Sequence, residues 1–92
     1  MSLAKRDVTI TNASGLHLRP AATFVQVANR HKGCEVHVTR DGQRVNGKSI
    51  MGLVMLAAPQ DSVLTIEVTG EGAEEALNEL VQLVESGFGM EG

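Results

Sequence analysis

The residues best suited to chemistry lie in the segment Ser14–Pro20, which reads Ser-Gly-Leu-His-Leu-Arg-Pro. Gly15 lets the backbone turn sharply just before His17, because glycine accepts positive φ angles without a steric cost. Pro20 suits the first turn of a helix, since its missing amide hydrogen would have no partner there. The pattern therefore places His17 where a loop meets a helix, and the free amides and the dipole of a helix start favour an anion.

A phosphoryl group is the anion that we expect at this histidine. Phosphorylation would add roughly two negative charges, which the helix amides and the planar guanidinium of Arg19 can bind. A phosphoramidate at an exposed helix end also stays reactive, so the group can be passed on. We therefore predict that His17 accepts the group and that Arg19 helps to hold it. The loop residues expected to support the phosphate are Ser14, Gly15 and Leu18. The plain alternative is that His17 is a polar helix cap and Arg19 a surface charge.

The elements that must position this segment follow from hydrophobic periodicity. Val8 and Ile10 alternate with polar residues, which predicts a first strand over residues 7–11. Further strands are expected over 34–39, 43–46 and 63–68, and helices ending near residues 32, 58 and 86. Ser49 is typical of the N-cap of the middle helix, and Pro59 cannot continue that helix. The order β-α-β-β-α-β-α predicts an α+β open-faced β-sandwich, with a four-stranded antiparallel sheet covered on one face by three helices.

Length and composition limit the classes of function. The 92 residues suit one domain, 1–92, and the single cysteine, Cys34, cannot form an intramolecular disulfide. Aromatic residues make up only 2% and the formal net charge is −3, so nucleic acid is not an expected partner. The N-terminal residues lack the apolar stretch of a signal peptide, and the longest apolar run, Leu53–Ala58, is too short to insert across a membrane. We expect a monomeric cytoplasmic protein that needs no cofactor.

His31, Cys34 and His37 are poorly placed for a metal site. Cys34 and His37 lie an odd number of residues apart on one predicted strand, so their side chains point to opposite faces of the sheet. Zinc would need them to converge. Cys34 is better explained as a small core residue, and no metal is expected.

Two segments resemble the HPr family, the histidine phosphocarriers of the bacterial phosphoenolpyruvate-dependent sugar phosphotransferase system. Gly15–Ala22 resembles the active-site segment of that family, and Val45–Gly52 resembles its regulatory-serine segment. The predicted order of elements agrees with the family's fold over nearly the whole chain. The resemblance implies that His17 accepts phosphate on Nδ1 from phosphorylated enzyme I and passes it to the IIA domains of transport proteins, with Arg19 helping to hold it. It also implies a carrier with a covalent phosphohistidine intermediate rather than a stand-alone enzyme.

The middle helix cannot bury every apolar side chain. Leu53, Leu56 and Ala57 are expected to face the sheet, which leaves some of Ile50, Met51, Val54 and Met55 exposed near His17. Exposed apolar groups beside a reactive side chain indicate protein docking. The contacts that the resemblance implies are Ile50, Met51 and Val54.

Three features leave the branch of the family open. Leu18 stands where the family often has a small or polar residue, which bears on partner choice. Glu85–Gly89 resembles the nitrogen-related branch, NPr. The resemblance also implies that Ser49 is phosphorylated by an HPr kinase/phosphorylase in some lineages, and that catabolite-repression paralogues bind transcriptional regulators through this serine. Those paralogues lack the histidine, so His17 favours the carrier over both the regulatory protein and a generic interaction domain.

Overall fold

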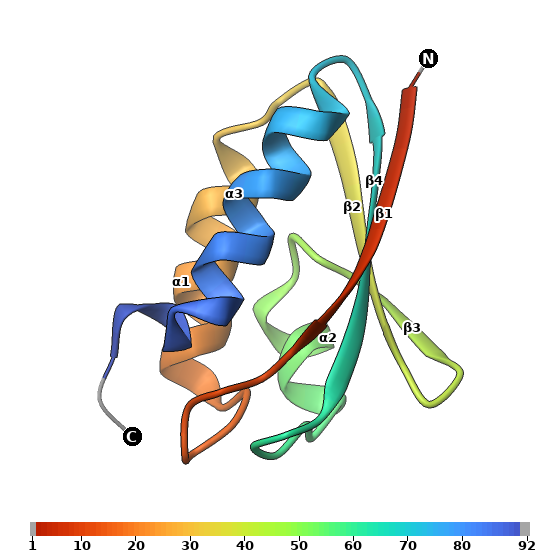
Figure 1. Cartoon of the computed structure of the whole chain (residues 1–92). Helices are drawn as coiled ribbons and strands as arrows, with labels where there is room; N and C mark the ends of the chain where they lie inside the picture. The colour runs from red at the N-terminus through yellow and green to blue at the C-terminus, as the bar shows by residue number, and fades with distance from the viewer. Residues whose placement is uncertain (1, 91–92) are drawn as a thin grey trace.

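The computed structural model describes residues 2–90 of the chain, which form four strands, three α-helices and a short 3-10 helix (Figure 1). In chain order the elements are β1 (Ser2–Thr9), α1 (Leu18–Asn29), β2 (Cys34–Arg40), β3 (Gln43–Asn46), α2 (Ile50–Met55), β4 (Val63–Gly70), α3 (Ala73–Glu85) and η1 (Gly87–Gly89). All pairings in the sheet are antiparallel, in the order β1-β4-β2-β3. The three helices cover one face of the sheet, so the predicted open-faced sandwich is confirmed (Figure 1).

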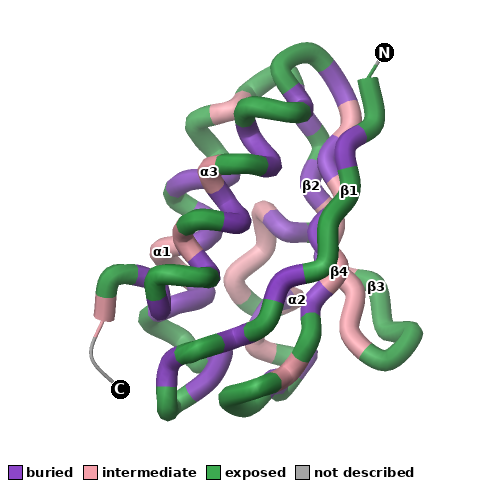
Figure 2. Tube along the Cα trace, viewed as in Figure 1, coloured by how far each residue is buried: buried purple, intermediate pink, exposed green. Residues whose placement is uncertain are grey.

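The core lies between the helices and the covered face of the sheet, where Figure 2 shows the buried residues gathered. Leu64, Ile66 and Val68 of the central strand β4 are all buried, whereas their neighbours along the strand are not. This alternation arises because successive side chains of a strand point to opposite faces. On the helix side, Phe24 of α1 and Leu80 of α3 fill the same core. Within residues 2–90, no helix is both long and apolar enough to cross a membrane.

Strand β1 begins at Ser2, five residues before the predicted start at residue 7. It pairs with β4 along its whole length, from Ser2 opposite Gly70 to Thr9 opposite Val63. The periodicity fails at Arg6, which shares the covered face with Ala4 but stays exposed and donates from Nη2 to Oδ1 of Asn78 on α3, 3.3 Å away. A charged residue at an inward position of an edge strand hides the alternation that the prediction relied on.

Helix α1 ends at Asn29 and not near Lys32 as predicted. The chain then turns through residues 30–33 into β2. The Nζ of Lys48 donates to the carbonyls of His31, at 3.0 Å, and Cys34, at 2.7 Å. These bonds come from a residue distant in sequence, so the local pattern around residues 30–33 could not indicate them.

Helix α2 ends at Met55 and not at Ala58, so the predicted helix is too long. The residue before a proline is disfavoured in the α conformation, which forces the chain out of the helix before Ala58 and Pro59. Ala57 takes a left-handed conformation with φ of 48°. The prediction that Ala57 faces the sheet is therefore wrong: Ala57 is exposed and Ala58 is buried in its place, whereas Leu53 and Leu56 are buried as expected.

Gly47 lies against the backbone of β2 in the turn that leads from β3 to α2. Its amide donates to the carbonyl of Val36 at 2.7 Å, and a Cβ atom at Gly47 would overlap the Cγ1 atom of Val36. Val36 is itself buried. The glycine of the segment that resembles the regulatory-serine motif is therefore required by packing.

Replacing Gly47 by alanine should lower the free energy of unfolding by about 1–3 kcal/mol, the usual cost of forcing extra atoms into a packed core. Gly33→Ala is the matched control, because a Cβ atom there would lie 3.7 Å from the nearest atom, the carbonyl oxygen of Glu71. Urea unfolding of both variants measures the difference. Equal stability of the two variants would show that the contact with Val36 does not constrain the fold.

Candidate functional site

His17 lies at the N-terminus of α1, as its N-cap residue, with extended backbone angles of φ −91° and ψ −168°. Its side chain is exposed and makes no capping hydrogen bond. Its carbonyl accepts the first helical hydrogen bond, from the amide of Ala21 at 3.0 Å. The alternative that the imidazole serves as a cap therefore lacks its defining bond, and the ring is free to react.

The first turn of α1 presents free hydrogen-bond donors beside this ring. Pro20 has no amide hydrogen, and the amides of Leu18 and Arg19 have no acceptor among residues 2–90. Helix starts of this kind bind anions, because unpaired amides and the dipole point the same way. The exposed Arg19 can add its guanidinium to the same anion.

The loop before His17 is pressed against the chain that leaves α2. Gly15 has φ of 70°, and a Cβ atom there would overlap the carbonyl oxygen of Ala58. The amide of Leu16 donates to that same oxygen at 2.8 Å. The predicted turn at Gly15 is present, but the close approach to Ala58 also makes glycine necessary there.

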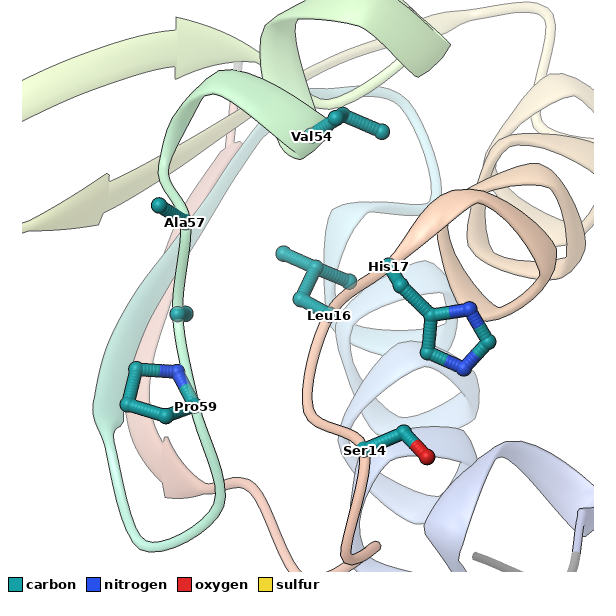
Figure 3. Close-up of a pocket in the computed structure, with 7 residues that line it drawn as sticks. Ser14, Leu16, His17, Val54, Ala57 and Pro59 are labelled. Carbon is teal, nitrogen blue, oxygen red and sulfur yellow. The ribbon is translucent and has the colours of Figure 1, made fainter.

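A shallow hollow of about 340 Å³ lies between this loop and the end of α2. Figure 3 shows Leu16 directed across it toward Ala57, while the His17 ring lies on the other side of the loop, beside the exposed Ser14. The residues that line the hollow are Ser14, Leu16, His17, Val54, Ala57, Ala58 and Pro59. The His17 side chain at the edge of this hollow is exposed to solvent.

Three large apolar side chains of this region are exposed: that of Leu18, which follows His17, and those of two methionines of α2. Leu18 is 61% exposed, Met51 68% and Met55 64%. Ile50 and Val54 are only half-buried and pack against the core from the same helix. Of the expected docking residues, Met51 is thus the most accessible. Met55 was expected among the exposed apolar residues but not among the contacts that the resemblance implies, and its position four residues after Met51 places both on one helix face.

Ser49 is the N-cap of α2, as the sequence predicts. Its Oγ accepts from the amide of Gly52 at 3.0 Å, and the residue is half-buried. Gly52 is also closely packed, because a Cβ atom there would lie 3.3 Å from both Oγ of Ser49 and Cβ of Val45. The fold accounts for Ser49 without any modification.

Cys34 and His37, which were weighed as metal ligands, lie on opposite faces of the sheet. Cys34 is buried and its thiol donates to the carbonyl of Glu71 at 3.0 Å, whereas His37 lies half-buried on the uncovered face of the sheet.

Asn12, which the sequence analysis did not single out, is the one buried polar residue among those described. A sequence signal for it exists, because asparagine side chains often bind the backbone of a turn and Asn12 lies five positions before His17.

The chain matches the family model described as the HPr component phosphorylation site of the phosphotransferase system, over residues 4–86. It is 44% identical over 87 residues to the phosphocarrier protein HPr of Neisseria meningitidis serogroup A, covering 95% of this chain and 97% of the relative. The matched residues include the loop, α1 and α2, and therefore the whole candidate site.

Solved structures give the same result. The crystal structure of HPr from Thermoanaerobacter tengcongensis superposes with a TM-score of 0.89 at 42% identity, covering 96% of this chain and 98% of that chain. Crh, the catabolite-repression protein of Bacillus subtilis, superposes with a TM-score of 0.74 at 42% identity, covering 87% and 91%, and its crystal structure is a dimer with a swapped domain. The expectation of a monomer therefore gains no support from that relative. The match over residues 4–86 and the shared fold show that this chain belongs to the HPr family.

Proposed function

We propose that this chain is a cytoplasmic phosphocarrier that accepts a phosphoryl group on His17 from phosphorylated enzyme I and transfers it to IIA domains of the sugar phosphotransferase system. The observation that carries the proposal is the exposed, unbonded imidazole at the start of α1. Membership of the HPr family supports the choice of donor and acceptor proteins.

The transfer needs little from the carrier beyond position and charge. A ring nitrogen of His17 attacks the phosphorus with its lone pair, the bond from phosphorus to the donor breaks, and the donor keeps that electron pair. The amides of Leu18 and Arg19 and the Arg19 guanidinium are placed to bind the oxygens of the transferred group. On the second transfer a nucleophile of the acceptor protein attacks the phosphorus, the N–P bond breaks and the His17 ring keeps the electron pair. The exposed phosphoramidate at the helix end is reactive enough for this step.

The partners are expected to dock on the apolar surface formed by Leu18, Met51 and Met55. Each of these side chains is more than half exposed, and Leu18 is the direct neighbour of the reactive histidine. Flexible, polarisable methionines suit a surface that must bind more than one partner in turn. Ile50 and Val54 pack against the core and are only half-buried, so they would form the less exposed part of this surface.

The alternative is a regulatory protein that acts through phosphorylated Ser49, or a carrier of the nitrogen-related branch. The regulatory role finds less support in the geometry, because Oγ of Ser49 is already engaged with the amide of Gly52 and the motif around it is explained by packing. A carrier of the nitrogen-related branch would use the same His17 chemistry with different partners.

Incubation with enzyme I and radiolabelled phosphoenolpyruvate should label the chain on His17. The label should be lost on treatment with acid and heat, since phosphohistidine is acid-labile and phosphoserine is not. His17→Ala should take up no label, whereas His37→Ala, which alters a half-buried histidine on the uncovered sheet face, should be labelled like the unaltered chain. Acid-stable label, or label on His17→Ala, would contradict the proposal. No label on the unaltered chain would favour a simple interaction domain.

Replacement of Ser49 by alanine should lower the free energy of unfolding by ~1 kcal/mol, because the amide of Gly52 loses its acceptor. The rate of His17 labelling should stay unchanged. Ser62→Ala is the control, since no side-chain hydrogen bond involves Ser62 within residues 2–90. Chemical unfolding and the labelling assay together separate the roles: unchanged stability with slower labelling would mean that the Ser49 hydroxyl acts in the transfer and not as a cap.

A further inference from the structure

Asn12 occupies a position that its polarity alone would disfavour. It is only 6% exposed, and it lies in the loop between β1 and α1, five residues before His17. Burial of a carboxamide is unfavourable unless its hydrogen bonds are made. The bonds that Asn12 does make therefore indicate why this residue stands there.

Asn12 holds Gly15 through two hydrogen bonds. The backbone carbonyl of Asn12 accepts from the amide of Gly15 at 3.1 Å, which closes a tight turn. The side-chain Nδ2 of Asn12 donates to the carbonyl of Gly15 at 2.8 Å. The second bond is available only to a residue whose side chain carries a donor at that reach.

The Gly15 carbonyl and the Leu16 amide belong to one peptide group, and this group is held at both ends. Its oxygen accepts from Nδ2 of Asn12 at 2.8 Å, and its nitrogen donates to the carbonyl of Ala58, also at 2.8 Å. A planar peptide fixed at both its donor and its acceptor cannot rotate without breaking one of the bonds. Since only Leu16 separates this peptide from His17, its orientation sets the direction in which the chain enters α1.

The other half of the carboxamide has no hydrogen-bond partner within the described protein. Oδ1 of Asn12 is buried and has no hydrogen-bond partner among residues 2–90. The amide cannot be turned over to relieve this, because Oδ1 would then face the carbonyl oxygen of Gly15. The bond from Nδ2 to Gly15 is therefore the one hydrogen bond of the Asn12 side chain among residues 2–90.

The residues beside Asn12 are fixed by separate contacts. The carbonyl of Thr11 accepts from Nε2 of Gln60 at 3.0 Å, and its hydroxyl donates to the carbonyl of Glu85 at 3.4 Å. Gly87 packs on the same two residues, since a Cβ atom there would lie 3.7 Å from Cβ of Asn12. The start of the loop would thus keep its place without the Asn12 carboxamide. The group that would become more mobile on its removal is the Gly15–Leu16 peptide.

We propose that Asn12 is a positioning residue for phosphoryl transfer, which fixes the Gly15–Leu16 peptide and through it the placement of the His17 imidazole. The inference rests on the proposed function, because placement matters only if His17 is the acceptor. Asn12 touches neither the phosphate nor a partner. Its removal should impair the reaction and not the docking of partners, because Leu18, Met51 and Met55 lie outside the bonds that it makes.

The test is the steady-state kinetics of enzyme I with the full chain as phosphoryl acceptor. Asn12→Ala should lower kcat about tenfold with KM unchanged, because a small misplacement of a reacting group is costly in rate. Asn12→Ser, whose hydroxyl can still donate locally, should recover part of kcat and also keeps the test possible if the alanine variant does not fold. Val68→Ala is the control for lost stability. Val68 is a core residue near one end of β4, whereas the loop lies at the other end of the strand, next to the pair Thr9–Val63.

The outcomes separate the two levels of the proposal. If the unaltered chain accepts no phosphoryl group from enzyme I, the proposed function fails. If the unaltered chain is active, a kcat of Asn12→Ala equal to that of the unaltered chain or of Val68→Ala would overturn the positioning role. A rise in KM with kcat unchanged would overturn it as well, because it would assign Asn12 to docking.

Discussion

The close approach of the Gly15–Leu16 peptide to Ala58 is the constraint on which the site depends. It joins the loop before α1 to the chain that leaves α2, through a 2.8 Å hydrogen bond and a contact that leaves no room for a Cβ atom on Gly15. Both sides of the contact are backbone, and the Asn12 carboxamide holds the same peptide from its other end. It brings His17, at the start of α1, to the same hollow as Val54 of α2, so the proposed chemistry and the proposed docking would share one region of the molecule.

The electrostatics of this surface fit the proposed role of a carrier that both accepts and releases a phosphoryl group. His17 is exposed and unbonded, and the first turn of α1 supplies only the amides of Leu18 and Arg19 and one guanidinium to a bound phosphate. These donors are enough to bind the charge but leave the phosphoramidate accessible to a second protein. A buried site with more donors would hold the phosphate more firmly and transfer it more slowly, because tighter ground-state binding does not speed the next step.

Much of this arrangement could be predicted from the sequence, and the failures have physical causes. The position of His17 just before α1, the N-cap at Ser49 and the alternation in β4 depend on local signals, so they were found. The early start of β1 was hidden by Arg6, which lies inward yet stays exposed at the sheet edge. The contacts of Asn12 were missed because its partner is a backbone carbonyl in a turn, and because Gly87 of η1, which packs on it, is distant in sequence and is not reported by periodicity.

The most direct test of the central claim is a nuclear magnetic resonance measurement on the 15N-labelled chain after incubation with enzyme I and phosphoenolpyruvate. A new phosphorus signal should show scalar coupling to one ring nitrogen of His17, while the backbone signals of the Ser49 region change little. A phosphorus signal without coupling to that ring, or a phosphoserine signal at Ser49, would contradict the proposal that the imidazole at the start of α1 carries the phosphoryl group.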